Sequence, residues 1–190
     1  SLKIDLNKNE NFNLLINDNE LIKALSLLIF CSPLCEKVLI NLRKKMLFNY
    51  SKNKQIDKNM INFTIALGSQ CFLNEYVYYF SEEEKFKLEE LKQSINRDND
   101  NQDYKLALIS CYQSLSSINN KIINLDNYKS NNKEFLNLLN LQFREIVIEK
   151  NISFTINKIG NISDSISKEV KNQYESNPYP RWRYNSFAKE

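Results

Sequence analysis

Apolar residues recur every three to four positions along most of this chain, which is the spacing of helices that bury one face. The pattern predicts about seven helices, over residues 18–29, 33–46, 57–80, 81–95, 103–115, 133–149 and 163–176. Glycine occurs twice and proline three times among 190 residues, whereas sheets need many tight turns. We therefore predict an all-α fold, an irregular bundle of about six or seven helices.

Local signals mark several of these helices. Asp18 is a plausible N-cap, Ser32-Pro33 reads as an N-cap followed by a proline in the first turn, and Ser81 with Glu84 forms a capping box. The second helix is expected to turn Leu34 inward together with its other leucines. Gly68 falls in the middle of the third helix, where it is expected to let a neighbouring helix approach closely.

Two stretches depart from the helical period. Residues 1–17 begin with alternating apolar and polar residues and predict an extended N-terminal arm. Residues 152–159 alternate in the same way, and because no partner strand is evident they predict an extended strap across the helices. We divide the chain into a helical domain, residues 1–160, and a C-terminal helix with a Pro-rich strap or linker, residues 161–190.

Composition excludes several kinds of chemistry. The chain has no histidine, which removes Ser-His and Cys-His nucleophile pairs and His-based metal sites. Gly68 and Gly160 are too far apart to form a phosphate-binding glycine loop. No apolar run approaches the 18 residues of a membrane span, and no basic and apolar leader is evident. These features predict a cytoplasmic protein without a membrane partner.

The four cysteines all have apolar neighbours in sequence, and none forms a C-x-x-C pair. They are Cys31, Cys35, Cys71 and Cys111. Buried free thiols are the favoured interpretation, in keeping with a reducing compartment, and a four-thiolate zinc site is the alternative.

The net charge of +3 comes from basic and acidic residues mixed along the chain. Arg43-Lys44-Lys45 is the tightest basic cluster, with Arg181 and Arg183 near the C-terminus. A solvated helix face explains the first cluster more simply than nucleic acid does. A nucleic-acid-binding helical domain that uses these five side chains remains the alternative.

The segment from Tyr174 to Trp182 follows directly on the last helix and carries two closely spaced prolines. The prolines forbid a continuing helix and hold the chain extended. Tyrosine and tryptophan offer rigid apolar area and arginine offers a forked donor, which suits docking on another domain. The alternative to docking is that these aromatic side chains pack against the helical core of the same chain. The candidate docking residues are Tyr174, Asn177, Pro178, Tyr179, Pro180, Arg181 and Trp182.

A second candidate group is polar. Gln70, Asn74 and Glu75 are expected in mid-helix among apolar residues, where unpaired polar groups would be costly if buried. Internal hydrogen bonding is the favoured interpretation, and a binding site is the alternative.

Val170-Lys-Asn-Gln-Tyr-Glu-Ser-Asn-Pro-Tyr-Pro-Arg-Trp182 resembles the boundary segment of a group of bacterial class I S-adenosylmethionine-dependent methyltransferases. In that group a helical region, often preceded by tetratricopeptide repeats, joins the catalytic domain at Q-Y-E-x-N-P-Y-P-R-W. The stretch Gln70–Val77 with the following Glu82–Glu84 is similar to the helical region of the same group. Together these matches cover about 30 residues. The glycine-rich turn that binds the methyl donor in such domains is absent from this sequence.

The resemblance implies the accessory helical part rather than the catalyst. We therefore expect a non-catalytic interaction or scaffold module that positions a substrate or partner for an adjoining catalytic domain. The chain itself is expected to bind no cofactor, and S-adenosylmethionine enters only through a downstream domain.

Overall fold

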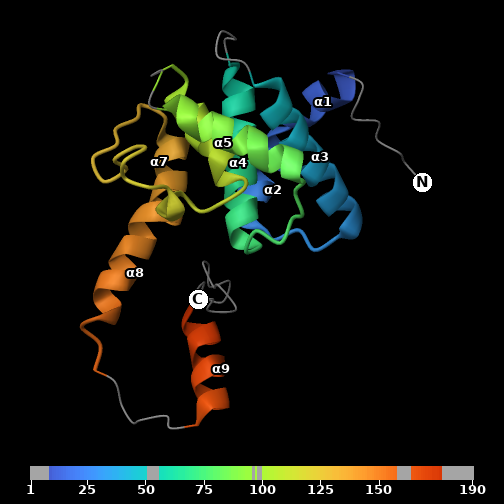
Figure 1. Cartoon of the computed structure of the whole chain (residues 1–190). Helices are drawn as coiled ribbons and strands as arrows, with labels where there is room; N and C mark the ends of the chain where they lie inside the picture. The colour runs from blue at the N-terminus through green and yellow to red at the C-terminus, as the bar shows by residue number, and fades with distance from the viewer. Residues whose placement is uncertain (1–8, 51–55, 96, 98–99, 158–163, 177–190) are drawn as a thin grey trace, which may run out of the picture. The chain divides into compact units, whose positions relative to one another are not determined.

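The computed structural model describes residues 9–50, 56–95, 97, 100–157 and 164–176 (Figure 1). The chain separates into two compact units, unit 1 of residues 1–151 and unit 2 of residues 152–190. The boundary expected after residue 160 falls among residues 158–163, which are outside the described part.

The described residues are helical and contain no strand, which confirms the all-α prediction. The elements of unit 1, with α8 running past its end, are α1 Asn9–Ile16, α2 Asn19–Leu27, α3 Pro33–Asn49, α4 Lys58–Leu73, α5 Glu82–Ile95, α6 Gln102–Ser110, the 3-10 turn η1 Leu115–Ser117, α7 Lys133–Leu139, the π-helical turn η2 Asn140–Arg144 and α8 Glu145–Ser153. Unit 2 contains α9, Ser165–Ser176. Because α7, η2 and α8 run on without a break, they correspond to the single helix expected over residues 133–149, and the helix beyond the expected six or seven is α1.

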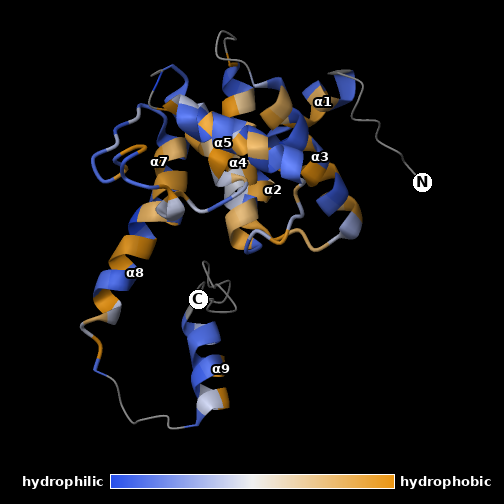
Figure 2. Cartoon of the chain, viewed as in Figure 1, coloured by the Kyte–Doolittle hydropathy of each residue, from blue (hydrophilic) through white to orange (hydrophobic). Residues whose placement is uncertain are grey.

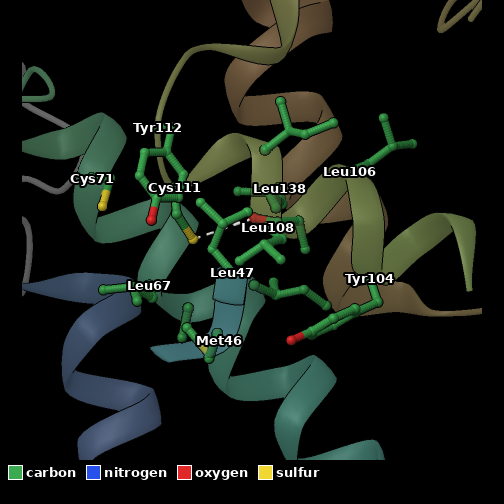
Figure 3. Packing of buried hydrophobic residues seen from close by; sticks show 14 of the residues in the cluster. Met46, Leu47, Leu67, Cys71, Tyr104, Leu106, Leu108, Cys111, Tyr112 and Leu138 are labelled. Atoms are coloured by element: carbon green, nitrogen blue, oxygen red, sulfur yellow. Dashed lines mark hydrogen bonds between the residues drawn. The ribbon is translucent and has the colours of Figure 1, made fainter. Parts of the chain in front are cut away.

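Helix α4 is the centre of unit 1, where it packs against α6, α2 and α7 (Figure 1). Every residue from Phe63 to Leu73 is buried, so the helix presents side chains to neighbours on all sides. Leu67 of α4 and Leu108 of α6 lie in this core, with Leu138 of α7 behind them (Figure 3). Gly68 faces Ser110 so closely that a Cβ there would collide with the serine hydroxyl. The predicted role of Gly68 as a point of close helix approach is therefore confirmed.

The N-terminal prediction is wrong over residues 9–16, which form α1 rather than an extended arm. Phe12 and Ile16 are four residues apart, so one helix face carries both into the core, where they are buried. Residues 1–8 are outside the described part. The N-cap at Asp18 is confirmed, because its carboxylate accepts hydrogen bonds from the N–H groups of Glu20 and Leu21 at 3.0 and 3.1 Å.

Helix α4 ends at Leu73, seven residues before the predicted end, so Asn74 and Glu75 are not in mid-helix. Glu75 and Tyr76 have left-handed backbones, with φ of 59° and 57°. The Tyr76 N–H bonds to the carbonyl of Cys71 at 2.8 Å and the Glu75 N–H to that of Phe72 at 3.1 Å. This is a Schellman motif, which usually has glycine at the position of Glu75. Without that glycine the sequence carries no stop signal.

The capping box is confirmed. The Ser81 N–H donates to the carboxylate of Glu84 at 2.9 Å, and the Glu84 N–H donates to the Ser81 hydroxyl at 3.3 Å, so α5 begins at Glu82. The expected strap at 152–159 is wrong at its start, because α8 continues through Ser153 and a turn follows. The fifth predicted helix also ends earlier than expected, at Ser110.

Candidate docking surfaces and buried polar groups

The sequence predicted that Arg43 lies on a solvated helix face, and this prediction is wrong. Its side chain is buried rather than part of a solvated basic face. The guanidinium donates to the carbonyls of Cys111 at 3.2 Å and Tyr79 at 2.8 Å, with Tyr78 at 3.5 Å. Arg43 therefore joins α3 to the end of α6 and to the connection between α4 and α5.

Its two lysine neighbours stay nearer the surface. The ammonium of Lys44 lies 5.2 Å from the centre of the Phe48 ring, and that of Lys45 lies 4.7 Å from the Phe12 ring. Lys44 also approaches Glu83 at 4.0 Å. The three consecutive basic residues thus point into different environments and do not form one basic face. Arg181 and Arg183 lie outside the described residues.

Tyr112 connects Arg43 to a buried carboxylate. The guanidinium carbon lies 4.2 Å from the centre of the Tyr112 ring, and the Tyr112 hydroxyl donates to Glu84 at 3.0 Å. Burial raises the pKa of Tyr112; the charge of Arg43 opposes this, while Glu84 raises it further. The other oxygen of Glu84 accepts the bonds that cap α5. These charged groups therefore hold helices together inside unit 1.

Gln70 is buried, and its amide is assigned the orientation that satisfies both of its atoms. It then donates to the carbonyl of Leu28 at 2.5 Å and accepts from the N–H of Phe30 at 3.2 Å. These bonds fasten the connection between α2 and α3 to α4. Of the two roles expected for Gln70, internal hydrogen bonding and ligand binding, the structure therefore shows internal hydrogen bonding.

Of the three polar candidates, Gln70 and Asn74 both lie beside the Tyr78 hydroxyl, whereas Glu75 does not join them. Asn74 is the C-cap residue of α4, with its amide atoms shielded from solvent, and Glu75 is exposed. Tyr78 lies close to Asn74, and burial raises the pKa of Tyr78 to about 12. The structure therefore brings Gln70 and Asn74 together inside unit 1 and leaves Glu75 at the surface.

Gln142 is a buried polar residue that the sequence patterns did not single out. The π-helical turn η2 carries it into the core, where it donates to the carbonyls of Gly68 at 2.8 Å and Ser110 at 3.4 Å. Its amide oxygen accepts from the Tyr76 hydroxyl at 3.1 Å and the Leu115 N–H at 3.3 Å. A π-helical turn shifts the helical period by one residue, so a 3.6-residue pattern cannot reveal it.

The cysteines divide into two kinds. Cys71 and Cys111 are buried in the core as predicted, whereas Cys31 is exposed and Cys35 half-buried. The Cys111 thiol donates to the carbonyl of Ala107 at 3.3 Å, and burial raises the pKa of this thiol (Figure 3). Within the described residues, no three cysteine, aspartate or glutamate side chains are grouped so as to hold a metal ion.

A hollow of about 860 Å³ lies beside the N-terminal ends of α4, α6 and α7. Asp103 lines it, but its carboxylate accepts bonds from the Tyr128 hydroxyl at 2.8 Å and the Ser130 hydroxyl at 2.5 Å. Burial raises the pKa of Tyr128, and the bond to Asp103 raises it further. Asp103 therefore fastens the connection that precedes α7.

Of the predicted docking residues, the structure describes only Tyr174. It lies on α9 with Ile166 and Val170, spaced four residues apart and therefore on one face of the helix. All three side chains are exposed. We call this row the α9 stripe. The other six candidates lie outside the described residues; they are Asn177, Pro178, Tyr179, Pro180, Arg181 and Trp182.

A second apolar surface lies on unit 1, and the sequence did not predict it. Leu34, expected to face inward, is exposed, as are neighbouring residues of the α2–α3 connection. That connection is apolar over much of its length in Figure 2. We define the end surface by its exposed apolar residues, which are Leu27, Leu28, Ile29, Leu34, Val77 and Tyr79.

Comparison of the chain with protein-family models, with curated proteins and with solved structures finds no match. Across the described helices, none is both long and apolar enough to cross a membrane.

Proposed function

We propose that this chain is a non-catalytic helical interaction module that holds a protein partner or an adjoining domain through the α9 stripe and the segment after it. The observation that carries the proposal is the exposure of Ile166, Val170 and Tyr174 together on one face of α9. Exposed apolar rows rimmed by polar residues mark protein interaction sites.

The length of α9 supports this proposal. A helix of 12 residues is marginally stable by itself in water, and most helical stability in proteins comes from packing of an apolar face. Burial of one such side chain stabilises a contact by about 1.5–3 kcal/mol. A partner that covers the stripe would therefore stabilise both the helix and the complex.

The sequence resemblance supports one kind of partner. Val170–Trp182 resembles the segment that precedes the catalytic domain in class I methyltransferases. The partner that we propose is a domain of that class, which would bind S-adenosylmethionine itself. Catalysis and cofactor binding are then properties of that domain and not of this chain.

The buried polar groups of unit 1 fit a structural rather than a reactive role. Arg43, Glu84 and Gln142 use their hydrogen bonds on backbone carbonyls, a helix cap and neighbouring side chains. Most polar atoms of these side chains already have partners inside unit 1, although Nε of Arg43 has none, so little capacity is left for a substrate.

The alternative, binding of nucleic acid, has less support. It relied on Arg43 as part of a basic face, and that side chain is buried. The lysines beside it lie over aromatic rings in separate places. A contiguous basic face would be needed for salt-dependent binding of phosphates.

The test measures binding of the whole chain to a separately expressed methyltransferase domain from a protein with the same Q-Y-E-x-N-P-Y-P-R-W segment. We expect Val170→Asp to weaken binding at least about tenfold, because it places a charge within an apolar contact. Ser167→Asp, on the same helix but outside the stripe, is the matched control and should bind as the wild type does. Absence of wild-type binding, or equal loss in both variants, would contradict the proposal.

Trp182 gives a second readout because it is the only tryptophan. In the isolated chain its fluorescence should be that of a solvated indole and should be quenched readily by acrylamide. Added methyltransferase domain should shift the emission to shorter wavelength and reduce the quenching. A protected indole before any partner is added would argue that the segment packs within the chain.

A further inference from the structure

The end surface of unit 1 brings two connections of the chain together. Gln70 of α4 bonds to Leu28 and Phe30 in the α2–α3 connection. The α4–α5 connection, which carries Val77 and Tyr79, leaves α4 only a few residues later. The carboxylate of Glu36, in the first turn of α3, lies near enough to Tyr78 to raise the pKa of the Tyr78 hydroxyl. The exposed apolar residues of both connections are therefore neighbours at one end of the bundle.

The α4–α5 connection is held rigidly. Its side chains alternate, so that Tyr78 is buried while Val77 and Tyr79 on either side are exposed. The guanidinium of Arg43 binds the carbonyls of Tyr78 and Tyr79 from inside, and the Schellman motif sets the direction in which the chain leaves α4. A surface fixed before binding loses little conformational entropy when a partner covers it.

The size of the surface suits a specific contact. Its six side chains are between 45% and 76% exposed. They present on the order of 600 Å² of accessible surface, at the upper end for the largest apolar patch of a monomer. A standard interface buries about 800 Å² on each partner, so this surface with its polar rim approaches what a stable dimer requires.

The charges beside the surface have both signs. Lys23 is exposed one turn before Leu27, Lys37 is exposed three residues after Leu34, and Glu75 is exposed two residues before Val77. In a two-fold dimer each copy presents the same patch, so a rim with both signs can pair an acid of one copy with a lysine of the other. If the rim carried charges of one sign only, the rims of the two copies would repel each other.

We propose that the end surface is a self-association site, at which two copies of this chain pack their α2–α3 and α4–α5 connections together. The dimer would hold two α9 stripes in one particle and so raise the avidity of partner binding. This inference does not rest on the proposed function, because it concerns unit 1 and needs no second protein.

The experiment is sedimentation velocity of the whole chain at loading concentrations between about 1 and 100 µM. We expect a monomer–dimer equilibrium with a dissociation constant in the micromolar range. Leu34→Glu should weaken the dimer at least about tenfold, because a carboxylate would replace an apolar side chain of the contact. Leu14→Glu on α1 is the matched control, since Leu14 is exposed to a similar extent outside the end surface, and it should dimerise as the wild type does.

Tyr79→Ser provides a second variant in case Leu34→Glu disturbs folding. The contact of Tyr79 with Arg43 is made by its backbone carbonyl, so the substitution leaves that bond in place. It should also weaken the dimer, with unchanged thermal unfolding of the monomer. A wild type that stays monomeric up to about 100 µM would overturn the proposal. A dimer that survives both end-surface variants, or that is lost in Val170→Asp instead, would also overturn it.

Discussion

The guanidinium of Arg43 lies 4.2 Å above the ring of Tyr112, which links the middle of α3 to the end of α6. The Tyr112 hydroxyl donates a hydrogen bond to the carboxylate of Glu84 in the first turn of α5. One cation, one aromatic ring and one carboxylate thus connect three helices inside unit 1. The cation lies on the ring face, where the quadrupole attracts it, and the contact is strengthened by the removal of water.

Arg43→Met should destabilise unit 1 by about 3 kcal/mol, because three carbonyls lose their donor and the ring of Tyr112 loses its cation. Arg43→Lys should recover only part of this loss, since an ammonium cannot reproduce the planar fork of the guanidinium. The measurement is urea unfolding followed by circular dichroism. Lys44→Met is the neighbouring control and should change stability by less than about 0.5 kcal/mol. Equal effects at the two positions would argue against the burial of Arg43.

Gly68→Ala should destabilise the chain by about 1–3 kcal/mol, although alanine is intrinsically the better helix former. The added methyl group would meet the hydroxyl of Ser110 across the α4–α6 contact. Ser110→Ala in the same chain removes that hydroxyl and should restore part of the stability. A double-mutant cycle measured by thermal unfolding gives the coupling between the two sites. A coupling near zero would show that the helices do not meet at Gly68.

Gln142→Leu should cost about 2 kcal/mol, because the carbonyl of Gly68 and the N–H of Leu115 would be left buried without the amide that binds them. Tyr76 would lose the acceptor of its hydroxyl at the same time. Hydrogen exchange should increase at Leu115 and around the end of α4. Gln113→Leu is the control, since its amide bonds only the exposed hydroxyl of Ser117 among the contacts described for it. A neutral effect of Gln142→Leu would contradict the network.

Stability should fall as the pH rises above about 10. Burial raises the pKa of Tyr78 to about 12 in the folded chain, so from pH 10 to 12 the unfolded state loses this proton and the folded state keeps it. The contribution is present in full below pH 10 and is lost as the pH approaches 12. One tyrosine adds a slope of up to about 1.4 kcal/mol per pH unit. Tyr78→Phe should reduce the slope of urea stability between pH 10 and 12 and leave it unchanged between pH 7 and 9. An unaltered slope above pH 10 would count against a buried phenol.

The beginnings of helices were the features most readily predicted. Asp18 and the pair Ser81–Glu84 act through side-chain bonds to N–H groups two or three residues away, so the signal and its effect lie in the same short segment. The all-α class followed from apolar spacing and from the scarcity of turn-forming glycine and proline. The close helix approach at Gly68 could be predicted because a glycine inside a helix is explained most simply by close packing against a neighbouring helix.

The sequence by itself determined the helical class, several helix starts and the close approach at Gly68, because each depends on neighbours within about one turn. The tertiary structure decided that Arg43 is buried, that α4 stops at Leu73, that Leu34 is exposed and that Gln142 enters the core. Each of these depends on groups far apart in the sequence. An arginine is solvated by default and becomes a core residue only where carbonyls and an aromatic ring from other helices replace its water.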